Sequence, residues 1–221
     1  MHIPPLAYAA GISVVFPVAA GAAKFRSLDK SLKSLLTLQI IYSSICLIQL
    51  FQALNDINNL WTSHVYIIIE YSFLLWIISS WQRSPKVKNI LLASIAVFAL
   101  FWICASMFLE HFDEPASYTN SLSRLVYCAV ALYTLRHLAL ESAISLLKEP
   151  RFWIVSALLV SSSGDLMFYS LRGVMAGLSM EDLKLAFSIH WILAIISNLL
   201  YSQGYLCRSP RNSGGLLPSA L

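Results

Sequence analysis

The fold class is set by a charge-free stretch, NILLASIAVFALFWICASMFL, which runs from Asn89 to Leu109. A helix needs about 20 mostly apolar residues to cross the hydrocarbon core of a bilayer, and this stretch has that length and composition. The rest of the chain has the same character, because 58% of its 221 residues are hydrophobic and only 12% are charged. These values lie outside the range of soluble globular domains. The sequence therefore predicts an integral membrane protein.

Short polar breaks separate this stretch from six others of similar character. Together they predict an all-α membrane protein, a seven-transmembrane-helix bundle over residues 1–207 with a disordered cytoplasmic tail at 208–221. No polar stretch between the spans is long enough for a soluble catalytic or nucleic-acid-binding domain. Pro17 predicts a kink in the first span. The predicted spans are Pro5–Ala23, Ser34–Leu54, Thr62–Trp81, Asn89–Leu109, Thr119–Leu138, Phe152–Leu171 and Leu183–Leu206.

The basic residues predict the orientation, because Lys and Arg are enriched in cytoplasmic loops. We expect the N-terminus outside and the C-terminus in the cytoplasm, which places most of the 15 Lys and Arg residues in inner segments. A cleaved signal peptide ending near Ala20-Gly21-Ala22 is the competing interpretation, but no Lys or Arg precedes that apolar run. The inner basic residues are Lys24, Arg26, Lys30, Lys33, Arg83, Lys86, Lys88, Arg136, Lys148, Arg151, Arg208 and Arg211.

The ionisable residues Glu70, Arg124, Asp165 and His190 each lie in a different predicted span. On the predicted topology all four lie in the outer half of the bilayer. A charged group in hydrocarbon costs at least about 2.5 to 3.5 kcal/mol on insertion scales, so such residues usually face a bundle interior or a watery cavity. The four residues therefore predict an outward-opening polar pocket between the second, third, fifth, sixth and seventh spans.

Other polar side chains share helix faces with these four. Tyr66 lies one helical turn from Glu70, and Tyr201 lies on the same face as His190, with Asn198 adjacent to that face. A polar stripe in the sixth span contains Ser161, Ser162, Asp165, Tyr169 and Arg172. The predicted ligand-binding residues are Glu70, Asp165, His190, Tyr66, Asn198, Tyr201 and Arg124.

Two further observations predict the limits of the pocket. The second span contributes Gln49 and Gln52 toward its outer end. Inward of Glu70, the same helix face holds Phe73 and Ile77, which leaves little polar character there beyond Gln39, Ser43 and Ser44. We therefore expect the pocket to close inward of Glu70.

The charged residues also allow simpler interpretations. Arg124 either forms ion pairs with the two acids or extends toward the membrane surface. Each of the four can also belong to polar contacts that only hold helices together.

The well-defined chemistries of seven-helix proteins find no support. A retinal protein requires a lysine within the last span, where only Lys184 lies, at the outer edge. Zinc hydrolases of the ceramidase and adiponectin-receptor type carry paired histidines in the last helix, and here that helix has only His190. P-loop, HExxH and GxSxG motifs are missing, so we expect no cofactor and no metal. A three-ligand metal site can still be drawn from His64, His190 and Asp165.

Three blocks of sequence carry a family resemblance: INNLWTSHVY (57–66) leading to Glu70-Tyr71, FWIV (152–155) continuing to Ser163-Gly164-Asp165, and IHW (189–191) continuing to NLLY (198–201). In these blocks the chain resembles an uncharacterised family of small seven-helix integral membrane proteins of Bacteroidota-type bacteria. The resemblance covers most of the chain and implies a multi-pass protein of the cell inner membrane. It implies no activity. Asp165 departs from the small amide or polar residue expected after Gly164.

Together these features predict a protein that senses or binds a small ligand from the outer side and signals to a separate cytoplasmic partner. The other expected partners are membrane lipids, with no nucleic acid. One alternative is a membrane-embedded, lipid-directed hydrolase that uses Glu70 or Asp165 with His190 as an acid–base pair. A proton-coupled small-solute transporter and a structural subunit of a membrane complex are the others.

Overall fold

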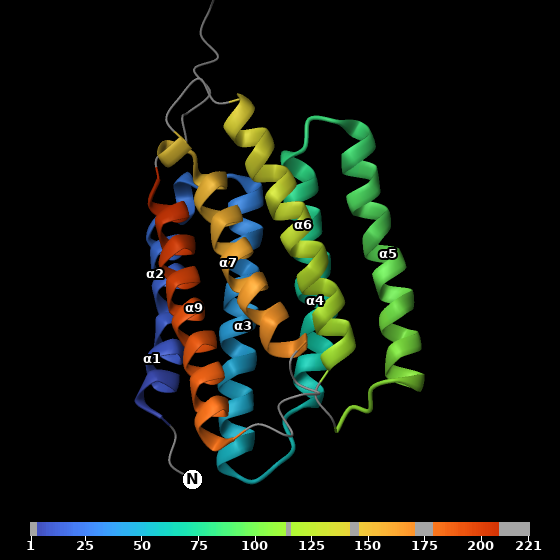
Figure 1. Cartoon of the computed structure of the whole chain (residues 1–221). Helices are drawn as coiled ribbons and strands as arrows, with labels where there is room; N and C mark the ends of the chain where they lie inside the picture. The colour runs from blue at the N-terminus through green and yellow to red at the C-terminus, as the bar shows by residue number, and fades with distance from the viewer. Residues whose placement is uncertain (1–3, 114–115, 142–145, 171–178, 208–221) are drawn as a thin grey trace, which may run out of the picture.

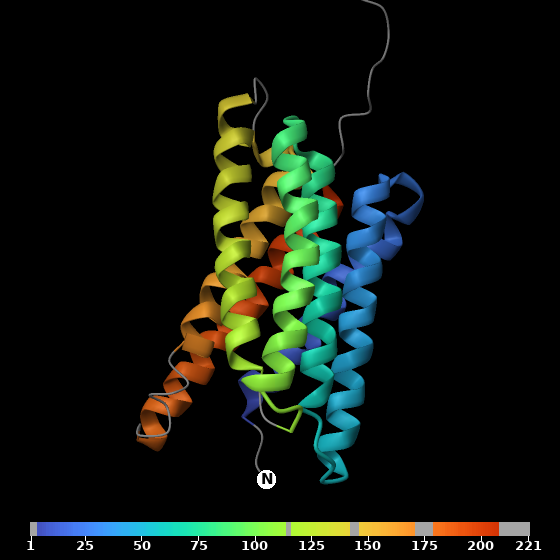
Figure 2. The ribbon, with the colours of Figure 1, turned by 90° about the vertical axis from the view of Figure 1, so that its right-hand side faces the viewer.

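The computed structural model describes residues 4–113, 116–141, 146–170 and 179–207. Within these ranges the chain is all-α, and the long helices run side by side (Figure 1, Figure 2). Arg172 and the predicted tail at 208–221 lie outside them. The helices are α1 (Pro5–Ser13), α2 (Val15–Ala23), α3 (Lys30–Leu54), α4 (Trp61–Trp81), α5 (Pro85–Phe108), α6 (Ser117–Glu141), α7 (Pro150–Ser170) and α9 (Met180–Leu206), with short 3-10 helices at Phe25–Ser27 and Leu146–Lys148.

With α1 and α2 counted as one, the described ranges hold seven long helices, six of them long and apolar enough to cross a membrane. The exception is α6, which forms over the whole of the fifth predicted span. Its apolar character is reduced by Arg124, Arg136 and several Ser and Thr residues. The most buried candidate span is α4, half of which is enclosed by the rest of the protein, against 17% for α5.

Local sequence signals set the starts of the helices. A proline is the first residue of α1, α5 and α7, where its missing N–H removes no helical hydrogen bond. Asp29 caps α3 by accepting a hydrogen bond from the Leu32 N–H at 2.8 Å. Ser179 caps α9 in the same way, accepting from the Asp182 N–H at 3.2 Å. Each cap satisfies an N–H group that has no partner within its helix.

The first span is interrupted at Val14, which separates α1 from α2. Pro17 explains the interruption, because it has no N–H to donate to the Ser13 carbonyl and its ring crowds that oxygen. Beside the break, the Ser13 hydroxyl accepts a hydrogen bond from Asn198 Nδ2 at 2.8 Å. This hydrogen bond therefore connects α9 to the interrupted part of the first span.

The helices pack mainly on their neighbours in chain order. The last helix, α9, also packs on α1 and α2, so the two ends of the helix order lie side by side. α5 is the outermost helix in Figure 1 and packs mainly on α4. Its other face exposes large apolar side chains, among them Val97, Leu100 and Met107, each at least 65% exposed. An apolar surface of this kind is expected where a helix faces lipid.

Close approach of α9 to α7 depends on Gly204, which is buried. A Cβ atom at this position would lie 2.8 Å from Ile154 Cγ1 and 3.4 Å from the Pro150 carbonyl oxygen. We expect Gly204→Ala to destabilise the protein by about 1–3 kcal/mol, because the two helices would have to separate. Thermal unfolding of the purified protein in detergent, followed by circular dichroism, measures the change.

The matched control is Gly11→Ala, in a first-span position where a Cβ atom would meet nothing within 4 Å. This substitution should leave the unfolding temperature unchanged or raise it slightly, because Ala favours helix over Gly. Equal losses in the two variants would contradict the packing role of Gly204.

Candidate functional site

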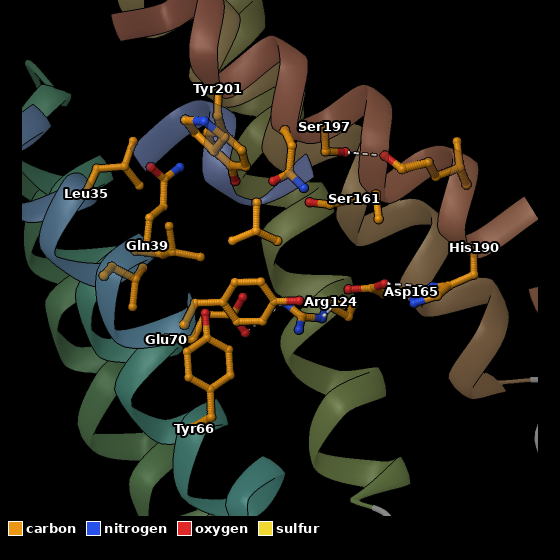
Figure 3. A pocket seen from close by; sticks show the side chains of 18 residues that line it. Leu35, Gln39, Tyr66, Glu70, Arg124, Ser161, Asp165, His190, Ser197 and Tyr201 are labelled. Atoms are coloured by element: carbon orange, nitrogen blue, oxygen red, sulfur yellow. Dashed lines mark hydrogen bonds and ion pairs between the residues drawn. The ribbon is translucent and has the colours of Figure 1, made fainter. Parts of the chain in front are cut away.

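Four ionisable side chains, each from a different helix, lie close together (Figure 3). Arg124 on α6 lies between two carboxylates, with Nη1 2.9 Å from Glu70 Oε2 on α4 and Nε 3.1 Å from Asp165 Oδ2 on α7. The second oxygen of Asp165, Oδ1, lies 3.3 Å from Nδ1 of His190 on α9. We call these four residues the charged cluster.

Arg124 is enclosed by protein and does not extend to the membrane surface, since it is only 8% exposed. The guanidinium carbon lies 5.4 Å from the ring centre of Tyr127, which is fully buried. A guanidinium presents donors in several directions within one plane and can serve two carboxylates at once, whereas an ammonium is a compact point charge. The position between Glu70 and Asp165 therefore suits arginine better than lysine.

A cavity of about 150 Å³ lies beside the charged cluster. Its wall is formed by residues from every long helix except α5, with α1 and α2 again counted as one. All seven predicted ligand-binding residues line this cavity. The sequence therefore identified residues that meet in space, although their role in binding stays a prediction.

Tyrosines and short polar side chains form much of the remaining wall. The rings of Tyr42 and Tyr66 are tilted against each other with their centres 5.3 Å apart. Figure 3 shows Tyr66 beside Glu70, and Tyr201 at the far side of the cavity. The wall thus combines aromatic faces, hydroxyl groups and charges, which suits a ligand with both polar and apolar parts.

The cavity continues past Glu70 toward the end of the bundle where α9 ends. On α4 the next residue in the wall is the apolar Leu74, in line with the predicted closure of that face. On α3, however, Gln39 lines the cavity, and its Oε1 accepts a hydrogen bond from the Tyr205 hydroxyl at 3.0 Å. On the wall that α3 forms, polar groups therefore extend inward of Glu70 through Gln39, whereas the wall that α4 forms is apolar there.

The contribution of α3 also differs from the prediction. Gln49 and Gln52 do not line the cavity, whereas Gln39 and Tyr42 do. Gln49 instead donates to the Thr62 hydroxyl at 2.7 Å, which joins the ends of α3 and α4. Tyr42 is the polar residue of this wall that the prediction missed. It lies three positions after Gln39 and shares its helix face, which is a weak signal in the sequence.

One buried donor in the wall has no protein partner. Gln39 is only 9% exposed, and its Nε2 has no hydrogen-bond partner among the residues that the structure describes. Figure 3 shows this amide turned toward the cavity. A buried donor left unpaired costs about 1–3 kcal/mol, so an acceptor atom in the cavity would remove a penalty that the protein otherwise carries.

The alternative metal site from His64, His190 and Asp165 is not formed. His64 does not line the cavity; its ring lies 5.0 Å from the ring of Phe112. Among residues 4–113, 116–141, 146–170 and 179–207, no group of three His, Cys, Asp or Glu side chains is placed to hold a metal ion.

Comparison of the chain with protein-family models, with curated proteins and with solved structures finds no match. The chain is a multi-helix protein with several candidate membrane spans, and no family is identified for it. The resemblance to small seven-helix proteins of Bacteroidota-type bacteria stays a prediction.

The charged cluster predicts a large effect of removing Arg124. We expect Arg124→Met to lower the free energy of unfolding by about 3–5 kcal/mol, because two enclosed carboxylates lose the partner that they share. Denaturant unfolding in detergent micelles measures the loss. Adding Glu70→Gln and Asp165→Asn to Arg124→Met should restore much of the stability, since no carboxylate is then left without its guanidinium partner.

The control is Arg151→Met, which removes an ion pair of Arg151 Nε with Glu149 Oε1 at 2.6 Å. The Arg151 side chain is 42% exposed, so this loss should stay within about 1 kcal/mol. Similar losses for Arg124→Met and Arg151→Met would show that the cluster does not stabilise the bundle.

Proposed function

We propose that the chain is a multi-pass protein of the cell inner membrane, with its N-terminus outside, that binds a small ligand in the cavity beside the charged cluster. Ligand binding changes how the helices pack, and a separate cytoplasmic protein detects the change. One observation carries the proposal: all four members of the charged cluster reach the wall of the same cavity.

The alternative to ligand binding is that the charged cluster only holds the helices together. Such a network is best served by close packing around the charges, yet about 150 Å³ of space adjoins them. An apolar cavity of comparable volume in another protein admits benzene, so a molecule of about six heavy atoms fits. Ionisable groups that face a cavity within a membrane usually belong to a binding or transport site. The space therefore favours binding over a purely structural role.

The shared wall supports transmission of a signal. A ligand that interacts better with one arrangement of the helices shifts the population toward that arrangement. The turn between α2 and α3 exposes Lys24 and Arg26, and α3 begins with the exposed Lys30. On the predicted topology these three residues face the cytoplasm. A basic surface of this kind suits an acidic partner protein.

The proposal predicts that cavity ligands stabilise the purified protein. Soluble amines, carboxylates and polyols of up to about six heavy atoms are screened by thermal unfolding in detergent. We expect at least one compound to raise the unfolding temperature of the wild type, and Glu70→Gln and His190→Ala to remove that rise, because both side chains line the cavity.

The control is Ser188→Ala on the same helix as His190. The Ser188 hydroxyl donates to the Lys184 carbonyl of its own helix and lies outside the cavity. This variant should respond to ligand as the wild type does. A screen in which no compound distinguishes the wild type from the two cavity variants would contradict the proposal.

A proton-coupled transporter is the second candidate, and the contact between Tyr205 and Gln39 favours it. Tyr205 lies one residue before the end of α9, so this contact extends the polar groups of the cavity toward the opposite end of the bundle from His190. Transport requires access to the cavity from both sides of the membrane in turn, whereas sensing requires access from the outer side only.

Cysteine labelling separates the two candidates. Ala194 and Leu35 line the cavity from α9 and α3, and Leu47 on α3 is 68% exposed on the apolar surface. In a background without the four native cysteines, a membrane-impermeant thiosulfonate should label Ala194→Cys from outside and should not label the control Leu47→Cys. If the protein is a sensor, Leu35→Cys should not be labelled from the cytoplasmic side. Labelling of Leu35→Cys from that side would favour the transporter.

A further inference from the structure

Two carboxyl groups of the charged cluster share one guanidinium. With both carboxyl groups ionised, Glu70 and Asp165 contribute two negative charges and Arg124 contributes one positive charge, so these three residues sum to −1. His190 adds a positive charge only when it is protonated. Among the residues that the structure describes, no lysine and no second arginine lines the cavity.

A net charge that is shielded from water is unfavourable unless an opposite charge accompanies it. Either a proton on the cluster or a cation in the cavity can supply that charge. The weak screening inside a protein makes the attraction on a cation several times stronger than in bulk water. An unbalanced cluster next to an open space therefore selects for positively charged ligands.

The wall supplies two further features that suit such a ligand. Tyr42 and Tyr66 present aromatic rings on the same side as Glu70, and aromatic faces attract cations. Gln39 turns an unpaired amide N–H toward the same space, which requires an acceptor atom on the ligand. The cavity volume of about 150 Å³ restricts the ligand to a few heavy atoms.

We propose that the cavity binds a small organic cation: a primary ammonium ion that also carries a hydrogen-bond acceptor, such as a hydroxyl oxygen. The ammonium group lies against the carboxylates of the charged cluster, and the acceptor faces Gln39. This inference rests on the proposed function, because it names the class of ligand that the same cavity binds.

The test measures the charge preference of the cavity with thiol reagents of matched size. Ala194→Cys, in the cysteine-free background, is reacted with 2-aminoethyl and with 2-hydroxyethyl methanethiosulfonate, which differ in one ammonium or hydroxyl group. Asn55→Cys, in the exposed loop between α3 and α4, gives the reference ratio of the two rates. We expect the ratio for Ala194→Cys to exceed the reference by about tenfold or more. Asp165→Asn should bring it back toward the reference.

Protection by free ligands gives a second readout that needs no change in the charged cluster. Ethanolamine should slow the reaction of Ala194→Cys with the neutral 2-hydroxyethyl reagent. Ethylene glycol and glycolate, which are similar in size but neutral and negative, should not.

The outcomes separate this inference from the proposed function. Two results would overturn the proposal of a cationic ligand and still leave a ligand-binding cavity. One is a rate ratio equal to the reference. The other is protection by glycolate or ethylene glycol without protection by ethanolamine. A proton already bound by Glu70, Asp165 or His190 would give that equal ratio. Failure of both reagents to modify Ala194→Cys while Asn55→Cys reacts would show that the cavity is closed, and the proposed function would fall as well.

Discussion

The contact of one guanidinium with two carboxylates determines the centre of this bundle. Arg124 can satisfy both Glu70 and Asp165 only if α6 lies between α4 and α7 at one particular depth. Without it, two like charges would face each other away from water. The same contact explains why α6 is the least apolar of the long helices: Arg124 is enclosed by the other helices, where a charge can be paired.

The space beside the cluster has an equally simple origin. On α7 and α9, the cavity wall includes Ser161, Ala194 and Ser197. These side chains are too short to fill the space beside the longer, ion-paired side chains of the charged cluster. Larger apolar residues at these positions would give a closely packed core. If the charged cluster only held the helices together, larger side chains at these positions would make the protein more stable, since cavities in a packed interior are unfavourable.

The sequence predicted much of this arrangement, for identifiable reasons. Long apolar stretches are enough to locate helices in a membrane protein, and an ionisable residue within such a stretch almost has to face the interior. These two constraints located Glu70, Arg124, Asp165 and His190, which the structure brings together. They are constraints on single helices, and each can be applied without knowing the neighbouring helix.

The errors arose where two helices have to be matched in depth and rotation. Gln49 and Gln39 are both uncharged polar residues on α3, and only the register of α3 against α4 places the second at the cavity and the first against Thr62. The extension of the cavity past Glu70 has the same cause, because it depends on α3 rather than on the apolar face of α4. Helix-to-helix register comes from packing of many side chains and has no local signature in one sequence.

The interruption at Val14 has a mechanical consequence. A helix that lacks one backbone hydrogen bond bends more easily there than a continuous helix does, and both Val14 and Pro17 border the cavity. The first span therefore has its bending point beside the cavity. Ala23, at the end of α2, lies about 9 Å beyond Pro17 along the helix axis, so a small tilt at the cavity becomes a larger sideways movement at the exposed basic turn that follows.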